Sequence, residues 1–216
     1  MNTTTPPTLY QSNGSPNSRR VRIFAAEKGL SLPTVAIDLG SAEQHGDAYR
    51  AINPRRVVPT LVLADGTAIG EVPAIQRYLE DAFPHHALFG TNAVEKALVT
   101  MWERRMELEG FAPVMEGIRN KIAGLKGRAI AGPHDYEQIP ELVDRSRQRV
   151  ANFYADLEAR LQEATHVAGE SYSVADITAL VAVDFATKAI DMPVPDDNQA
   201  TKRWYAKVSS RPSAAA

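Results

Sequence analysis

Up to residue 85, short apolar runs alternate with segments whose apolar residues recur at helical spacing. Val21, Phe24, Ala25 and Leu30, for example, recur as they would on one face of a helix. The short runs predict strands at residues 8–11, 35–38, 60–63 and 67–69, and the periodic segments predict helices at 15–29, 47–52 and 72–83. Such alternation is typical of an α/β domain.

Local signals mark where these elements begin and end. Ser15 is a good N-cap and Pro16 suits the first helical position, so a helix is predicted to begin there. Gly29 is a suitable C-cap for the same helix, and Pro84 stops the helix that precedes it. The pair at residues 65–66, Asp-Gly between two apolar runs, predicts a two-residue hairpin turn.

Beyond about Asn92 no further strand is predicted, and helical patterns follow one another. The first long pattern is expected to bend near Gly110 or Pro113. A stretch rich in glycine and proline at 126–140 reads as a loop. Helices are predicted at 93–121, 139–163, 173–185 and 201–208.

The helix predicted at 173–185 opens with Ser173 and Asp176 in the spacing of a capping box, just before an apolar run. No strand-like segment interrupts this second half of the chain. The fold class is therefore predicted as α/β plus all-α. One domain is expected at residues 1–85 and an all-helical domain at 92–216.

Composition narrows the classes of partner. With 44% hydrophobic and 23% charged residues among 216, the chain is ordinary for a soluble globular protein. A net charge of −2 provides no global field for nucleic acid or an anionic membrane. No apolar run approaches the roughly 20 residues of a membrane span, and residues 1–7 do not read as a secretory signal. We expect a cytoplasmic protein with no nucleic-acid and no membrane partner.

The chain contains no cysteine. Disulfides, thiolate metal ligands and a cysteine nucleophile are thereby excluded. His85 and His86 stand in a predicted linker without spaced carboxylates, which makes a poor metal site, and no metal is expected. If the protein acts on a thiol, that thiol belongs to its ligand.

The most informative pattern is Val58-Pro59 before a predicted strand, followed about a dozen residues later by Glu71 at the start of a predicted helix. A cis Val-Pro bond would turn a backbone edge outward, where a peptide-like ligand could pair with it. A helix N-terminus favours an anion. Taken singly, Val58-Pro59 is compatible with an ordinary strand start and Glu71 with an ordinary first-turn acid. Their order and spacing favour a binding site.

This arrangement resembles the glutathione-binding half of cytosolic glutathione S-transferases. The run at 167–178, VAGESYSVADIT, is similar to the buried-helix signature of the family, and the chain ends with Trp204-Tyr205 and Arg211-Pro212 as many members do. The segment 105–109 with Pro113-Val114 resembles a microbial branch first described in yeast. The resemblance implies a thioredoxin-like N-terminal domain and a C-terminal helical-bundle domain, and it assigns Ser173 and Asp176 to folding.

The resemblance also implies glutathione as co-substrate. Val58 would pair with its cysteinyl backbone beside a cis Pro59, and Glu71 would meet the γ-glutamyl amine. Most members carry serine or threonine where this chain has Val72, so only a backbone N–H remains for the γ-glutamyl carboxylate. His45 and Arg56 suit the glycyl carboxylate, or they are solvent-facing loop residues.

Ser15 is the candidate catalytic residue, because serine-type members place theirs between the first strand and the first helix. Its hydroxyl would donate to the ligand's sulfur, or it is purely an N-cap. Asn17, Ser18 and Tyr10 are alternatives. In the microbial branch a serine and a histidine on the first long helix can polarise a water, but the corresponding region here, 115–119, contains neither.

The electrophile is expected to lie against Asn13 together with Met106, Phe111 and Met115, although such residues at helical spacing are often core or dimer contacts. By resemblance the protein would be a homodimeric detoxification enzyme that conjugates glutathione to an electrophile or reduces hydroperoxides. The alternative is a glutathione- or ligand-binding protein of the same fold with little transferase activity.

Overall fold

A computed structural model describes residues 6–216, and it divides the chain into two compact units. The first unit reaches to His86 and includes Ala131–His134, and the second comprises Ala87–Ile130 and Asp135–Ala215. The sequence analysis did not read residues 1–7 as a secretory signal, and residues 1–5 of that segment lie outside the described part of the chain. Within residues 6–216 no helix is both long and apolar enough to cross a membrane.

The first unit is built on a mixed sheet of order β2-β1-β3-β4. Strand β1 is parallel to β2 and antiparallel to β3, which is antiparallel to β4. The strands are β1 (Thr8–Gln11), β2 (Thr34–Ala36), β3 (Thr60–Val62) and β4 (Ala68–Ile69). The helices are α1 (Pro16–Glu27), the one-turn η1 (Glu43–His45), α2 (Asp47–Ile52) and α3 (Val72–Ala82). The predicted α/β character of this half is confirmed.

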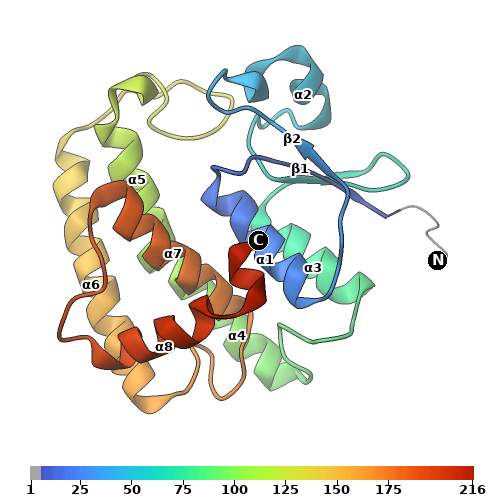
Figure 1. Cartoon of the computed structure of the whole chain (residues 1–216). Helices are drawn as coiled ribbons and strands as arrows, with labels where there is room; N and C mark the ends of the chain where they lie inside the picture. The colour runs from blue at the N-terminus through green and yellow to red at the C-terminus, as the bar shows by residue number, and fades with distance from the viewer. Residues whose placement is uncertain (1–5) are drawn as a thin grey trace. The chain divides into compact units, whose positions relative to one another are not determined.

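Helices α1 and α3 lie side by side (Figure 1) and bury their apolar faces. Phe24 and Leu79 have no exposed surface. Lys28, just after α1, donates to Glu80 of α3 over 2.7 Å, and its side chain is entirely buried. Gly29 follows with φ +67°, as the predicted C-cap requires.

The predicted two-residue hairpin turn is wrong. The N–H of Gly66 bonds the carbonyl of Leu63, and the N–H of Leu63 bonds the carbonyl of Thr67. Gly66 has φ +87°, whereas Asp65 does not have a positive φ. This is a three-residue loop in which a turn is closed by a left-handed glycine, so a two-residue turn with both residues left-handed does not form. The strand predicted at 35–38 also forms earlier, at Thr34–Ala36.

The second unit is helical, as predicted. Its helices are α4 (Ala93–Arg105), the π-helix η2 (Met106–Phe111), α5 (Ala112–Lys121), η3 (Ala123–Leu125), α6 (Glu141–Glu163), α7 (Val174–Ile190), α8 (Gln199–Ser209) and η4 (Pro212–Ala215). The segment predicted to bend near Gly110 contains a π-helical turn there. A Cβ at Gly110 would lie 2.6 Å from the Phe153 ring, so close packing requires glycine.

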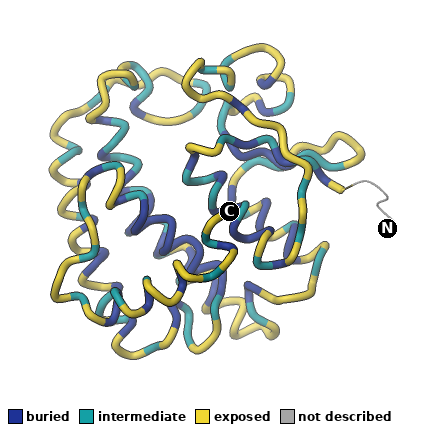
Figure 2. The backbone as a smooth tube through the Cα atoms, in the orientation of Figure 1, coloured by how far each residue is buried: buried dark blue, intermediate teal, exposed yellow. Residues whose placement is uncertain are grey.

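Helix α7 forms the centre of this unit, and its trace is almost continuously buried (Figure 2). Its first turn carries the predicted capping box, formed by Ser173 and Asp176. Asp176 has no exposed surface. Its Oδ1 accepts from Trp204 Nε1 at 2.8 Å and from the Val167 N–H at 3.0 Å, and its Oδ2 accepts from the Ser173 N–H at 3.0 Å.

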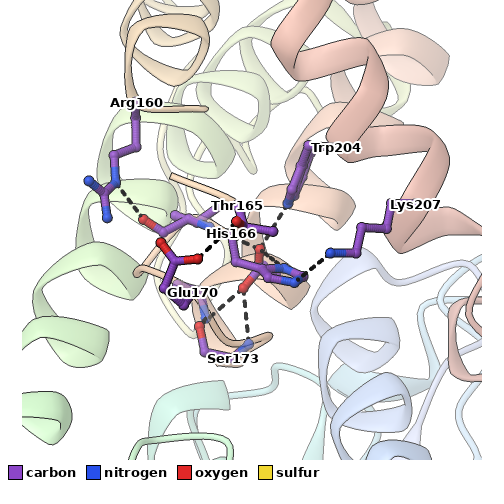
Figure 3. A network of polar contacts seen from close by, with 10 residues as sticks. Arg160, Thr165, His166, Glu170, Ser173, Trp204 and Lys207 are labelled. Atoms are coloured by element: carbon purple, nitrogen blue, oxygen red, sulfur yellow. Dashed lines mark hydrogen bonds and ion pairs between the residues drawn. The ribbon is translucent and has the colours of Figure 1, made fainter. Parts of the chain in front are cut away.

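The network around this cap extends outward from His166 (Figure 3). His166 Nδ1 lies 3.3 Å from Asp176 Oδ1, and its Nε2 lies 3.2 Å from Lys207 Nζ. Arg160 Nε donates to the Val167 carbonyl at 2.9 Å. The cap thus ties α7 to α6, to α8 and to the segment before it. This supports the folding role that the resemblance implies for Ser173 and Asp176.

Candidate glutathione site

Strand pairing brings the main sequence-predicted site residues to one end of the sheet in the first unit. In the β1–β3 register Tyr10 is paired with Thr60, and in the β3–β4 register Leu61 is paired with Ile69. The end of β1, the start of β3 and the end of β4 therefore lie side by side at one end of the sheet. The β1–α1 loop, the Val58–Pro59 bond and the start of α3 adjoin these strand ends along the chain.

The Val58–Pro59 peptide bond is cis, as the sequence analysis expected. Val58 packs in a buried cluster with Ile37 and Tyr49, against which Tyr10 rests. This core contact fixes the segment just before β3 from its apolar side. The role of Val58 and Pro59 in binding stays a prediction.

Two polar residues that the sequence analysis missed hold the same segment. Tyr49 Oη donates to the Val57 carbonyl at 2.6 Å and lies 2.9 Å from Thr60 Oγ1. Asn53 Nδ2 donates to the same two oxygens, at 3.0 and 2.8 Å. Burial raises the pKa of Tyr49, although hydrogen bonds with Thr60 and Asn53 oppose the shift. The sequence signals that could have pointed to these contacts were Asn53 directly before a proline and Thr60 at the start of an apolar strand.

Glu71 immediately precedes α3 in a conformation that side chains rarely adopt, with φ +64° and ψ 126°. It is exposed, and its side chain makes no capping hydrogen bond to the helix. Such a backbone costs on the order of 1–3 kcal/mol and persists where the surroundings enforce it. Val72, the first helical residue, is 4% exposed. The N-terminus of α3 is thus left without a side-chain cap.

Ser15 is the N-cap of α1: its Oγ accepts from the Ser18 N–H at 3.3 Å. A serine hydroxyl has one donor hydrogen and two acceptor lone pairs. Accepting the cap bond therefore leaves the O–H able to donate to another group. Ser15 is 8% exposed. Capping and donation to a sulfur are compatible, and the catalytic role stays a prediction.

The alternatives to Ser15 are differently placed. Ser18 has no exposed surface, and its Oγ accepts from the Ser12 N–H at 3.3 Å. Asn17 Oδ1 accepts from Arg20 Nη1 at 3.2 Å. Tyr10 is half-buried, with its ring centroid 6.4 Å from that of Tyr49. Of these side chains, Ser18 is the least able to reach a ligand.

The candidates for the glycyl carboxylate lie on either side of α2. Arg56 has φ +56°, and its buried Nε has no hydrogen-bond partner among the described residues. A buried unpaired donor is costly unless something accepts from it. His45 is half-buried in η1. The neighbouring Gln44 has a buried Oε1 that is likewise unpartnered within residues 6–216. Sequence reasoning did not select Gln44.

The residues predicted for the electrophile belong to both units. Asn13 is exposed in the β1–α1 loop of the first unit. In the second unit Met106 is 2% and Phe111 is 4% exposed, and the Phe111 ring centroid lies 5.5 Å from that of Phe185. Met115 is half-buried on α5. Met106 and Phe111 have core positions, and the pocket role of all four stays a prediction.

Comparison with known proteins identifies the family. The family model for the glutathione S-transferase N-terminal domain matches residues 9–87, and the model for the C-terminal domain matches residues 117–212. Glutathione S-transferase 2 of Saccharomyces cerevisiae is 33% identical over 208 residues, which cover 95% of this chain and 86% of that protein. The chain therefore belongs to the glutathione S-transferase family.

Solved structures place the chain within that family. A glutathione S-transferase domain-containing protein of Marinobacter aquaeolei superposes with a TM-score of 0.88 at 32% identity, covering 95% of this chain and 98% of that one. A glutathione S-transferase of class Gtt2 from Vibrio parahaemolyticus gives 0.81 at 32% identity, with coverages of 95% and 94%. These matches confirm the thioredoxin-like and helical fold and the microbial, Gtt2-like branch. Weaker relatives are named for isomerase and disulfide oxidoreductase activities.

Within residues 6–216 no group of three or more histidine, aspartate or glutamate side chains could hold a metal ion. The family takes glutathione as its substrate.

Proposed function

We propose that this protein activates the thiol of glutathione and transfers its sulfur to an electrophilic carbon of a small molecule. The observation that supports this most is the convergence, at one end of one sheet, of the cis Val58–Pro59 bond, the uncapped start of α3 and the Ser15 hydroxyl. Together these supply a backbone edge, an anion site and a donor, which are the groups that an anionic thiol peptide needs.

In this proposal the backbone of Val58 pairs with the cysteinyl residue of glutathione. Glu71 accepts from the γ-glutamyl amine, and the Val72 N–H donates to the γ-glutamyl carboxylate. Arg56 and His45 face the glycyl carboxylate. The unpaired Arg56 Nε supports this assignment, since an arginine N–H is a strong donor to a carboxylate.

The chemistry is nucleophilic substitution by a thiolate. A free thiol titrates near pH ~8.5, so little thiolate exists at neutral pH. Ser15 would donate its O–H hydrogen bond to the sulfur and so lower the thiol pKa, and the thiol proton would pass to solvent. The sulfur then forms a bond to carbon, and the leaving group departs with its electron pair. With an organic hydroperoxide, two glutathione molecules would instead yield the alcohol, water and glutathione disulfide.

The test is calorimetric titration with glutathione, combined with thiolate ultraviolet absorbance followed against pH. We expect wild type to bind glutathione with its thiol pKa below about 7.5. Ser15→Ala should still bind it with the pKa returned toward about 8.5, whereas Ser15→Thr, which keeps both hydroxyl and cap, should resemble wild type. An absence of binding would refute a glutathione site, and an unchanged thiol pKa in Ser15→Ala would remove Ser15 from the mechanism.

A second candidate function is glutathione or ligand binding with little transferase activity. Val72 favours it, because valine offers no hydroxyl to the γ-glutamyl carboxylate. The cap bond of Ser15 also favours it, since that hydroxyl already has a structural role. Glutathione binding with an unshifted thiol pKa in wild type would support this function over the first.

The proposed enzyme is also a homodimer. Helix α4 exposes an apolar stripe of Val94, Leu98 and Met101, which are 68%, 45% and 45% exposed and recur at helical spacing. A second copy of the chain could cover this stripe with its own through a two-fold axis. Light scattering should give the dimer mass for wild type and the monomer mass for Leu98→Glu, and a monomeric wild type would refute this.

A further inference from the structure

Arg22, on the second turn of α1, reaches back to the last residue of β1 and to the two loop residues that follow it. Its Nη1 donates to Gln11 Oε1 at 2.6 Å and lies 3.4 Å from the Ser12 carbonyl. Its Nη2 lies 3.5 Å from the Asn13 carbonyl. The guanidinium fork therefore spans the first part of the loop between β1 and α1.

Every oxygen that Arg22 bonds among the described residues is uncharged. Burial lowers the pKa of this half-buried guanidinium, and the nearby charge of Arg19 lowers it further. Both effects disfavour its charged form, and no carboxylate offsets them within the described chain. Among the residues that the structure describes, Arg22 therefore does not form an ion pair. Its contribution is to fix the positions of the groups to which it donates.

Packing contributes little at the tip of the loop that Arg22 bonds. Asn13 and Gly14 are exposed, and a Cβ added to Gly14 would meet nothing within 4 Å. The loop is held by hydrogen bonds. Gln11 Nε2 donates to Asn13 Oδ1 at 2.9 Å, so the side chain that accepts from Arg22 also fixes the tip of the loop.

The far end of this loop is Ser15. The Ser15 N–H bonds the Ser12 carbonyl at 3.0 Å, and the Ser12 N–H bonds Ser18 Oγ at 3.3 Å. Ser12 thus joins two sets of bonds, one from Arg22 and one from the first turn of α1. A displacement of Ser12 would move both the N–H and the hydroxyl of Ser15.

We propose that Arg22 is a positioning residue, which holds the loop at residues 12–14 so that the Ser15 hydroxyl points at the sulfur of bound glutathione. The inference rests on the proposed role of Ser15. Arg22 acts through the loop and touches neither the sulfur nor the electrophile. A misplaced donor loses most of its effect on a reacting atom.

The variants are Arg22→Met, which removes the fork, and Arg22→Lys, which keeps the charge without it. Arg77→Met is the matched control, because Arg77 is an exposed arginine of α3 in the same unit that pairs with Asp81. Three properties are measured: the thiol pKa of bound glutathione, kcat with chlorodinitrobenzene at saturating glutathione, and hydrogen exchange of the amides of Ser12 and Ser15.

We expect Arg22→Met to raise the thiol pKa by about one unit, to lower kcat about tenfold and to speed exchange at the Ser12 and Ser15 amides. Arg22→Lys should move all three in the same direction, since a single ammonium cannot span the loop. Arg77→Met should leave them unchanged. A wild-type thiol pKa in Arg22→Lys would show that charge suffices and would overturn the proposal.

The double variant Ser15→Ala/Arg22→Met separates positioning from a direct effect. If Arg22 works through Ser15, the double variant should have the thiol pKa of Ser15→Ala alone. Additive shifts would overturn the proposal in favour of direct electrostatics. A raised thiol pKa in Ser15→Ala with none in Arg22→Met would overturn the role of Arg22 alone. An unchanged thiol pKa in Ser15→Ala would overturn the role of Ser15 and, with it, that of Arg22.

Discussion

Helices α7 and α3 begin in opposite ways. At the start of α7, the carboxylate of Asp176 has no exposed surface and accepts from Ser173, Val167 and Trp204. At the start of α3, Glu71 is exposed, has φ +64° and makes no capping bond. Both helices have an acidic residue in or beside the first turn, yet only one acid is used to complete the helix.

Under the proposed function, the difference separates a cap that stabilises the fold from a helix start that is left open for glutathione. A helix N-terminus with satisfied N–H groups gains stability but cannot bind an anion. A helix with free N–H groups and a strained residue before it gives up stability and keeps an anion site. The acid that most resembles a folding signal, Asp176, is therefore structural. The acid that resembles an ordinary surface residue, Glu71, belongs to the proposed site.

The largest expected effect comes from breaking the closed cap. Asp176→Ala would leave the buried N–H groups of Ser173, Val167 and Trp204 unpaired, and we expect a loss of about 3–5 kcal/mol of unfolding free energy in urea. Asp176→Asn keeps one acceptor oxygen and should lose less. A loss below about 1 kcal/mol in Asp176→Ala would mean that α7 does not depend on this cap.

Smaller effects, on both stability and glutathione affinity, are expected at Glu71, before the uncapped start of α3. Glu71→Gly relieves the positive φ and should raise the unfolding free energy by about 1 kcal/mol. It also removes the proposed partner of the γ-glutamyl amine, so the affinity for glutathione should fall about tenfold or more. Urea unfolding and calorimetric titration measure the two changes.

Asp191→Gly is the matched control for Glu71→Gly. Asp191 has φ +53° at the end of α7, so its replacement by glycine also relieves a positive φ, but away from the proposed site. It should change the stability without changing glutathione affinity. If Glu71→Gly bound glutathione as tightly as Asp191→Gly does, Glu71 would have no role in the site.

The smallest expected effect on stability concerns α8, whose N-terminal N–H groups are capped by a side chain of another helix. Asn198 makes no capping bond, but Glu158 of α6 accepts from the N–H groups of Ala200 and Thr201 at 3.0 and 2.8 Å. Burial raises the pKa of Glu158, but these hydrogen bonds and others outweigh burial, and the pKa lies below the usual 4.5.

Since its folded pKa is lowered, Glu158 stabilises the fold above pH 4.5, and this contribution disappears as the pH falls through the folded value. Glu158→Gln should cost about 1 kcal/mol near neutral pH. The difference from wild type should close as urea unfolding is repeated at pH values below 4.5. A gap that is independent of pH would show that the charge of Glu158 is irrelevant to the cap.

Much of the fold could be predicted because its signals are local. The capping box at Ser173 and the helix start at Ser15-Pro16 depend on residues within a turn of each other, and both are confirmed. The hairpin at Asp65-Gly66 was wrong in detail because the same dipeptide suits more than one loop. The loop that forms leaves Asp65 without a positive φ.

The hydrogen bonds that hold the candidate site in place could not be predicted from the sequence. The cis Val58–Pro59 bond was expected from its motif, but Tyr49 and Asn53 reach the Val57 carbonyl from eight and four positions away along the chain. Arg22 joins α1 to the end of β1 across a separation of eleven positions from Gln11. Such bonds depend on how α1, α2 and the strands are packed, and no short motif records them.

The sequence by itself determined the order of the elements and the two-part α/β and helical architecture, because periodicity, caps and short motifs act over a few residues. The residues proposed to meet glutathione came from its resemblance to a family. Only the tertiary structure decided that Glu71 stands strained before an uncapped helix, that Asp176 is fully buried and satisfied, and that Arg22 bonds the loop before Ser15. Each of these depends on groups brought together by the sheet register and helix packing. Burial and hydrogen-bond partners are properties of that assembled whole.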